Sequence, residues 1–215
     1  GGTPLSSGET VGATVEGGAI PLDGRLSPPG APGPAVPATL RALLGSRIDA
    51  LSGETRTVLR VASVLDVSVG EARVEAVLGN TVAPAVYERL AEAAMIVPID
   101  SRGGWRFCHP LIHDAAYSSL LASDRRSLHA RVADQIEGHP RPPAIGVLAH
   151  HRAAAGDADR AIPLLLQAAD QSLDLGARSE AAAYLEAAAA LASGEVATAL
   201  AARAFTLRSA ASDGG

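Results

Sequence analysis

The stretch Trp105-Arg-Phe-Cys-His-Pro-Leu-Ile-His-Asp-Ala-Ala-Tyr-Ser-Ser-Leu-Leu121 decides how the middle of the chain folds. Its first residues, 105–109, alternate between apolar and polar side chains, which predicts a half-buried strand. Pro110 suits the first turn of a helix, because the N–H that proline lacks would have no partner inside the helix there. From Leu111 onward, apolar residues recur at helical spacing. The stretch therefore predicts a strand that runs directly into a helix.

His109 lies at this strand-to-helix junction, close to the electropositive N-terminus of the predicted helix. A helix N-terminus is a place where an anion such as a phosphate can bind. The alternative is that the imidazole caps the helix or packs against it, which is the commoner role of a histidine in such a position. Residue types alone leave both interpretations open.

Residues 107–117, Phe-Cys-His-Pro-Leu-Ile-His-Asp-Ala-Ala-Tyr, resemble the end of the winged-helix domain in STAND-type signalling ATPases. This group includes NB-ARC and MalT-like proteins and large bacterial regulators of the LuxR type or linked to adenylate cyclase. The bacterial regulators often carry Phe-x-His-Pro-Leu-Ile-x-Asp-Ala-Ala-Tyr at this point. In NB-ARC proteins an aspartate follows the histidine. Here Pro110 takes its place, so no role of that carboxylate carries over.

The resemblance implies a nucleotide-sensing role for His109, because the corresponding histidine of the family helps to hold ADP in the closed, resting state. Near the start of the chain, Gly2-Thr3-Pro4-Leu5 and Gly18-Ala19-Ile20 resemble the end of the family's ATPase lid. The proline of that segment lies against the adenine in the family, which implies the same contact for Pro4. The resemblance further implies ATP or ADP, together with Mg²⁺, as cofactors of the parent protein.

The composition favours a mainly α-helical protein of one or two small domains. The chain has 215 residues, of which 47% are hydrophobic and 3% aromatic, and alanine favours closely packed helices. The net charge of −5 argues against general nucleic-acid binding. The single cysteine, Cys108, cannot form an internal disulfide, and the sequence shows no signal peptide or membrane-spanning run. We expect a cytoplasmic protein with no membrane partner.

The first residues predict a linker rather than a domain. The chain begins Gly1-Gly2-Thr3-Pro4 without an initiator methionine, and Met95 is its single methionine, so we expect a portion of a longer protein. Residues 1–37 are poor in core-forming side chains, and residues 27–37 are rich in proline and glycine, which is typical of an extended linker. We therefore assign residues 1–37 to the tail of an ATPase lid and a linker.

Residues 38–122 are predicted to form a winged-helix domain, in which short helices precede a β-hairpin. Helices are expected at residues 39–51, from Ser52 to Leu65, at 69–78 and at 84–95. Apolar residues on one face of the first and fourth helices are expected to enter the core. In the first helix they are Leu40, Leu43, Leu44, Ile48 and Leu51. In the fourth helix they are Val86, Leu90, Ala93 and Ala94.

The hairpin is predicted to pair residues 96–99 with 105–107. The helix before it, residues 83–94, occupies the position that reads DNA in other winged helices, yet it carries Glu88 and Glu92 against Arg89 alone. A helix that enters the major groove normally brings positive charge and hydrogen-bond donors. We therefore expect no direct contact with nucleic acid, and a DNA-binding winged helix is the weakest of the functional alternatives.

Residues 123–215 are predicted to form an α-helical solenoid that resembles tetratricopeptide repeats. Segments that begin at Gly156 and Gly176 share a glycine, a charged turn and small residues suited to close packing. Such helix pairs stack into a superhelix with a concave binding face. The sequence ends without a capping helix, so we expect a truncated solenoid.

The first helix of this region is expected to begin at Ser123 as its N-cap and to carry its apolar side chains on one face. These side chains are Leu128, Val132 and Ile136. The same helix carries several basic residues, which we expect to form a solvated basic surface. They are Arg125, Arg126, His129 and Arg131.

Two histidine pairs could suggest a metal site. His109 and His113 stand four apart, as zinc ligands on a helix can, but a metalloprotease would need a glutamate between them and residues 110–112 are apolar. The pair His150-His151 has no third ligand nearby, and we expect one side chain inside the fold and the other outside. We predict no metal site.

No feature of the sequence predicts catalysis by this chain itself. Cys108 stands at an apolar strand end, where a thiol is usually buried and inert. The sequence has neither a phosphate-binding Gly-x-x-x-x-Gly-Lys-Ser/Thr loop nor a Gly-x-Ser-x-Gly motif. We expect no catalytic residues and no cofactor for the isolated chain, although its parent would be an ATPase.

We interpret the sequence as a regulatory portion of a nucleotide-switched signalling ATPase. Its partners would be an ATPase core upstream and a protein or small-molecule inducer bound to the helical repeats. The main alternative is a stand-alone helical-repeat module for protein–protein contact, with no nucleotide.

Overall fold

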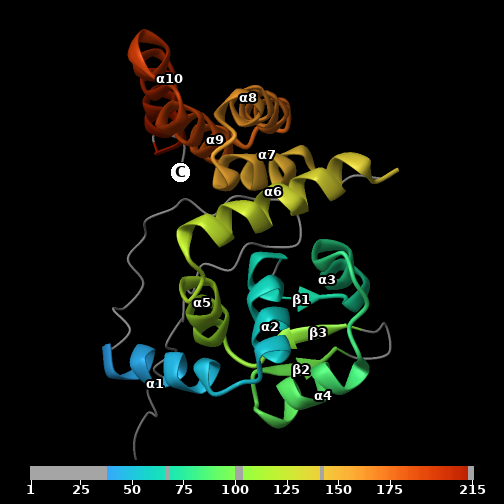
Figure 1. The fold of residues 1–215 in the computed structure, drawn as a ribbon. Coiled ribbons are helices and arrows are strands. Elements are labelled where there is room, and N and C mark those ends of the chain that lie inside the picture. The colour runs from blue at the N-terminus through green and yellow to red at the C-terminus, as the bar shows by residue number, and fades with distance from the viewer. Residues whose placement is uncertain (1–37, 66–67, 100–103, 141–142, 213–215) are drawn as a thin grey trace, which may run out of the picture.

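The computed structural model describes residues 38–65, 68–99, 104–140 and 143–212. Pro4 and the predicted lid tail and linker lie outside these residues. Within them the chain forms ten helices and one three-stranded sheet (Figure 1). The predicted mainly α fold, a winged helix followed by packed helices, is confirmed.

The first unit, which ends with the helix after the wing, contains five helices and the sheet. In chain order these are α1 (Ala38–Asp49), α2 (Gly53–Leu65), β1 (Ser68–Val69), α3 (Glu71–Leu78), α4 (Pro84–Glu92), β2 (Ile96–Pro98), β3 (Trp105–Phe107) and α5 (Pro110–Ser118). The predicted start of α2 at Ser52 is confirmed, because the Ser52 Oγ accepts a hydrogen bond from the Thr55 N–H at 3.3 Å.

The sheet has the strand order β1-β3-β2, and both pairings are antiparallel. The predicted hairpin is confirmed, with Ile96 opposite Phe107. The prediction missed β1 and instead began the third helix at Val69. A strand of two residues shows no recognisable alternation, and β1 forms because Val69 pairs with Trp105 of the central strand.

Two predicted core positions are wrong. Leu43 on α1 is 58% exposed, because Leu44 and Ile48 mark the centre of the buried face and Leu43 lies at its edge. Ala94 is exposed, because α4 ends at Glu92 and the backbone then turns into β2 through a φ of 51° at Ala94.

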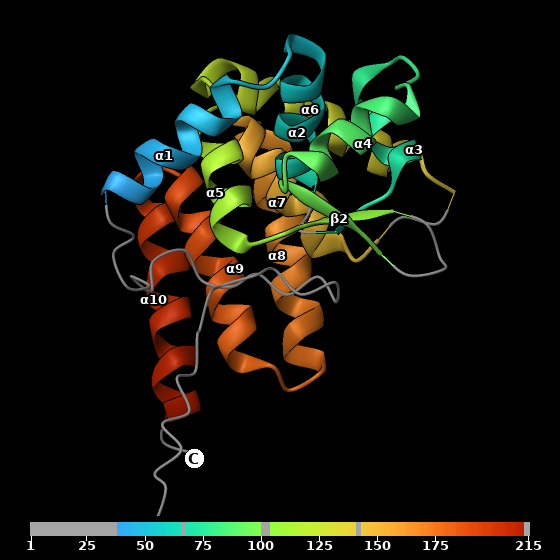
Figure 2. The ribbon, with the colours of Figure 1, turned by 90° about the horizontal axis from the view of Figure 1, so that it is seen from below.

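The second unit contains five consecutive helices. They are α6 (Ala122–Gly138), α7 (Ile145–Ala155), α8 (Ala158–Asp174), α9 (Arg178–Leu191) and α10 (Gly194–Ser212). Each packs against the next, and α7 to α10 lie beyond α6 on the side away from the sheet (Figures 1 and 2). Glycines in the left-handed conformation follow the ends of two of these helices, Gly156 with φ 82° and Gly176 with φ 76°.

Helix α6 lies between two hydrophobic cores. Val132 and Ile136 enter the core of the winged helix, and Leu128 packs against it. A second core is built mainly from alanine and leucine side chains of α7 to α10. The proposed boundary at residue 122 is the first residue of α6, so the first core extends past that boundary into this helix.

Ser123 is not the N-cap of α6. The N-cap is Leu121, two residues earlier, so α6 begins at Ala122, and the Arg125 N–H donates to the Leu121 carbonyl at 2.9 Å. The Ser123 hydroxyl instead donates to Asp124 at 3.4 Å. The error arises because a serine near a helix start is the usual cap, whereas here a backbone contact alone starts the helix.

None of the helices in the described ranges combines the length and the apolar character needed to cross a membrane.

Candidate functional site

His109 lies between β3 and α5 and is the N-cap of α5. Its backbone is extended, with φ −152° and ψ 143°, and its Nδ1 accepts a hydrogen bond from the Leu111 N–H at 3.1 Å. Pro110 occupies the first helical position, as predicted. The capping interpretation of His109 is therefore confirmed by geometry.

Capping fixes the proton arrangement of the imidazole. Because Nδ1 of His109 accepts a hydrogen bond, the proton of the neutral ring is on Nε2. The next backbone donor, the Ile112 N–H, bonds to the His109 carbonyl at 3.0 Å. The backbone donors at the start of α5 are thus used within the turn. Since the His109 side chain is exposed, its Nε2–H is the donor that an anion would meet.

The elements on both sides of His109 are anchored in the core. Phe107 at the end of β3 is 3% exposed, and Ile112 and Ala116 on α5 are buried. The rings of Phe107 and His113 meet edge to face, with centroids 5.2 Å apart. The histidine cap therefore stands on a rigid strand-to-helix junction.

The contacts of His113 do not support a metal-binding role. Its Nδ1 lies 3.1 Å from the carboxylate of Asp114, and its ring packs on Phe107 and Tyr117. Among the described residues, no group of three histidine, cysteine, aspartate or glutamate side chains is arranged to hold a metal ion. Cys108 is partly buried against the first core.

The predicted basic surface on α6 is wrong for His129, which is 1% exposed. Arg125 also turns inward, and its guanidinium carbon lies 4.5 Å from the centre of the Tyr117 ring. Because α6 packs against the winged helix on one face and against α7 on another, a residue between the two apolar stripes is buried as well. The basic run in the sequence does not show this second contact.

His129 connects three helices through hydrogen bonds that sequence reasoning missed. Its Nε2 lies 3.0 Å from the Tyr117 hydroxyl on α5, and its Nδ1 lies 2.8 Å from Nδ1 of His151 on α7. Of the expected pair with one side chain inside and one outside, His151 is inside, but the expectation is wrong for His150, which is only partly exposed and has its ring 5.7 Å from that of His129. No spacing rule links residues on three separate helices.

All three histidines of this cluster are held neutral at neutral pH. Burial is the largest cause that lowers the pKa of His129 to about 3, followed by His150 and Arg125. Burial is likewise the largest cause that lowers the pKa of His151 to about 2, followed by the two neighbouring histidines and Arg73. Burial also lowers the pKa of His150.

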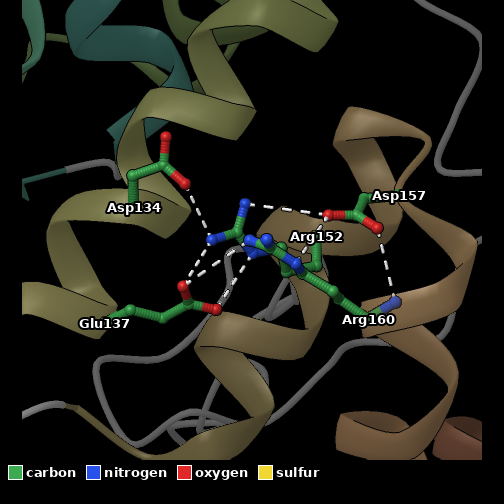
Figure 3. Close-up of polar contacts among 5 residues, drawn as sticks. All are labelled: Asp134, Glu137, Arg152, Asp157 and Arg160. Carbon is green, nitrogen blue, oxygen red and sulfur yellow. Dashed lines mark hydrogen bonds and ion pairs between the residues drawn. The ribbon is translucent and has the colours of Figure 1, made fainter.

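Arg152, the next residue on α7, joins three helices by charge (Figure 3). Its guanidinium is 3% exposed and lies 2.8 Å from Asp134 and 2.6 Å from Glu137, both on α6. On the other side it is 3.8 Å from Asp157, the N-cap of α8. The hydrogen bonds that the Arg152 guanidinium donates to the Glu137 carboxylate are the largest cause that raises the pKa of Arg152. No local pattern in the sequence indicates this cluster, because its members come from separate elements.

Helix α4 offers little positive charge to a partner. Its one cation, Arg89, lies 3.8 Å from Glu54 and its Nε is 3.4 Å from the Thr55 hydroxyl, both at the start of α2. Glu88 and Glu92 are exposed.

Comparison with known proteins finds a family similar to the middle part of the chain. The family model of the MalT winged helix domain matches residues 46–128. An uncharacterized protein of Rhizobium meliloti (strain 1021) is 30% identical over 152 residues, which cover 67% of this chain and 15% of that protein. The chain thus spans a small fraction of the length of this relative.

The family match covers the parts of the molecule that hold the candidate site. It begins within α1 and ends within α6, so it includes the sheet, α5 and the His109 cap. The helix order, the wing and the match agree. This chain therefore contains a winged-helix domain similar to that of MalT-like proteins.

Proposed function

We propose that the chain is a regulatory part of a nucleotide-switched signalling ATPase of the STAND type, working in the bacterial cytoplasm. The winged helix acts as a lid on an ATPase core upstream, which binds ATP or ADP with Mg²⁺. His109 contacts the phosphates of the bound nucleotide and stabilises the closed state. The match to the MalT winged helix domain supports this assignment.

The observation that carries the proposal is the geometry of His109. An exposed imidazole, with its Nδ1 occupied by the Leu111 N–H, presents Nε2–H from a junction that is fixed by buried residues on both sides. A neutral donor in a fixed orientation can bind a phosphate oxygen of ADP. Pro4, outside the described residues, remains the proposed contact for the adenine.

The charge of α4 favours a lid over a DNA-reading domain. Arg89 is engaged by the start of α2, and the two glutamates of the helix face solvent. Phosphate contacts to DNA require available cations, so this surface suits a protein neighbour better than a nucleic acid. The output of the parent would then come from another module, such as a LuxR-type DNA-binding domain or an adenylate cyclase.

The helices α7 to α10 are proposed to be the start of tetratricopeptide-like repeats that bind a protein or small-molecule inducer. Consecutive packing of antiparallel helices with small side chains at their contacts supports this role. A ligand that binds the repeats more tightly in the open state would shift the lid equilibrium and so regulate the ATPase.

The test compares ADP retention in the parent protein after two substitutions at one position. His109→Asn keeps a side-chain acceptor for the cap but lacks the imidazole, whereas His109→Ala removes both. Both variants should lose the ADP that copurifies with the parent and raise its basal output, while His139→Gln, at an exposed histidine after α6, should not. Normal ADP content in both His109 variants would overturn the proposal and leave the helical-repeat adaptor as the function to test.

A further inference from the structure

The chain of contacts from Tyr117 through His129 to His151 crosses the interface between the winged helix and the helical repeats. Each residue lies on a different helix, α5, α6 and α7 in turn. The Tyr117 hydroxyl lies 3.0 Å from Nε2 of His129, and Nδ1 of His129 lies 2.8 Å from Nδ1 of His151. His129 and His151 are 1% and 3% exposed, so water does not compete for these bonds.

The hydrogen bonds among Tyr117, His129 and His151 have a preferred donor-to-acceptor order. If the Tyr117 hydroxyl donates to Nε2 of His129, the proton of that neutral ring is on Nδ1, which then donates to Nδ1 of His151. In the reverse order, the Tyr117 hydroxyl would accept and its own proton would need another acceptor. In the forward order the protons of the Tyr117 hydroxyl and of His129 both have acceptors, and both imidazoles are neutral.

The contact between His129 and His151 cannot form when both imidazoles are positively charged. Two protonated imidazoles would place two N–H groups against each other across the 2.8 Å that separates the Nδ1 atoms. The other groups that act on the pair add to the cost. They are Tyr117 on α5, Arg125 on α6, His150 on α7 and Arg73 on α3, of which the arginines are cations and His150 is a further base.

We propose that His129 and His151 form a proton-sensitive joint, which holds the helical repeats against α6 while both rings are neutral and lets α7 separate from α6 when they take up protons. The Arg152 cluster with Asp134 and Glu137 is a second connection across the same interface and opposes the separation. The joint is a property of the chain itself and does not depend on the proposed nucleotide site.

The change of the opening equilibrium with pH follows from the pKa of the two histidines in the open state. Once α7 leaves α6, both rings are hydrated and titrate near pH 6.5. Lowering the pH from 7.5 to 5.5 then favours the open state by about tenfold for each histidine, or about 100-fold for the pair. Histidine is the side chain that changes charge in this range, so the ion pairs of Arg152 stay charged.

The experiment is hydrogen exchange by mass spectrometry on the complete chain at pH 7.5 and 5.5, with labelling times scaled for intrinsic exchange and a chelator present to exclude bound metal. We expect the opening equilibrium of peptides from α7 and from the facing side of α6 to rise by about 100-fold, and peptides from α2 to change far less. The His139→Gln variant, which lacks one exposed histidine, should behave as the unmodified chain does.

Two variants make the result decisive. In His151→Gln the rise should shrink about tenfold, and in the double variant His129→Gln with His151→Gln it should shrink further, to the part that His150 contributes. If the double variant does not fold, the single variant still tests the inference. The proposal would be overturned by an opening equilibrium that is equal at the two pH values. It would also be overturned by a rise in His151→Gln as large as in the unmodified chain. Since no nucleotide is present, neither result depends on the role of His109.

Discussion

His129 and His151 face each other across the α6–α7 interface with their Nδ1 atoms 2.8 Å apart, and both side chains are buried. The same α6 carries Val132 and Ile136 into the core of the winged helix. Helix α6 therefore belongs to both units: it completes the winged-helix core and presents a polar, neutral contact to the first helix of the repeats.

The stability of the chain should fall with acidification because of this pair. A histidine whose pKa is lowered by folding binds fewer protons in the native state, so its stabilising contribution is complete above pH 6.5 and is lost as the pH falls below that value. For His129, whose folded pKa is about 3, the loss continues from pH 6.5 to about 3. Each buried histidine should lower the free energy of unfolding by up to about 1.4 kcal/mol per pH unit. Urea unfolding at pH 7.5, 6.5 and 5.5 measures the slope.

The control for this slope is the exposed His139. Replacing it with glutamine should leave the slope unchanged, whereas replacing His151 should reduce it. A slope that does not respond to His151→Gln would contradict the neutral, buried pair.

Arg152→Met should destabilise the chain by about 2 kcal/mol, because it removes a buried cation that holds Asp134 and Glu137. The cost stays below that of a fully buried ion pair, since the two carboxylates are partly exposed and regain water. Thermal or urea unfolding gives the difference. Arg160→Met is the matched control, as Arg160 is 61% exposed and should contribute less than about 0.5 kcal/mol. Equal effects of the two substitutions would rule out a stabilising role for the Arg152 cluster.

The capping role of His109 can be separated from any nucleotide contact in this chain. His109→Ala should cost about 1 kcal/mol of stability, because the Leu111 N–H loses its acceptor. His109→Asn should cost little, since asparagine is among the best N-cap residues. Urea unfolding measures both. A stable alanine variant would mean that the cap contributes nothing, although nucleotide contact in the parent would still be open to test.

Because α7 and α9 approach closely at Gly146, replacing this glycine should lower the stability of the chain. A Cβ at this position would collide with the hydroxyl oxygen of Tyr184, so Gly146→Ala should destabilise the packing of α7 to α10 by about 1–3 kcal/mol. Tyr184→Phe in the same chain should relieve part of the cost. Gly138→Ala on α6 is the control, since nothing lies within 4 Å of its Cβ position. If thermal unfolding shows equal effects of the two alanines, the packing of α7 on α9 is not as described.

Periodic apolar spacing was enough to predict most of the fold. The helices from α1 to α5 and the β2–β3 hairpin follow directly from it. At His109 the sequence leaves capping and anion binding open, and the structure shows the cap. Strand β1 could not be predicted, because two residues carry no period and their pairing depends on β3, which lies far along the chain.

The polar clusters at the α6–α7 interface were missed for a different reason. His129 and Arg152 look like residues of solvated helix faces when each helix is considered alone. Their burial depends on a neighbouring helix that covers a second face of α6, and only the packing of whole helices shows it. Chemistry that joins separate helices has no local pattern in the sequence.

The central claim, that His109 contacts bound nucleotide, is tested most directly by the dissociation rate of labelled ADP from the parent protein with His109→Asn. This substitution keeps the cap and therefore the fold, so a change in rate reports the lost imidazole. The account predicts that ADP leaves at least about tenfold faster, which corresponds to about 1.4 kcal/mol of lost contact energy. A dissociation rate equal to that of the unmodified parent would contradict it, and His109 would then serve only as the cap of α5.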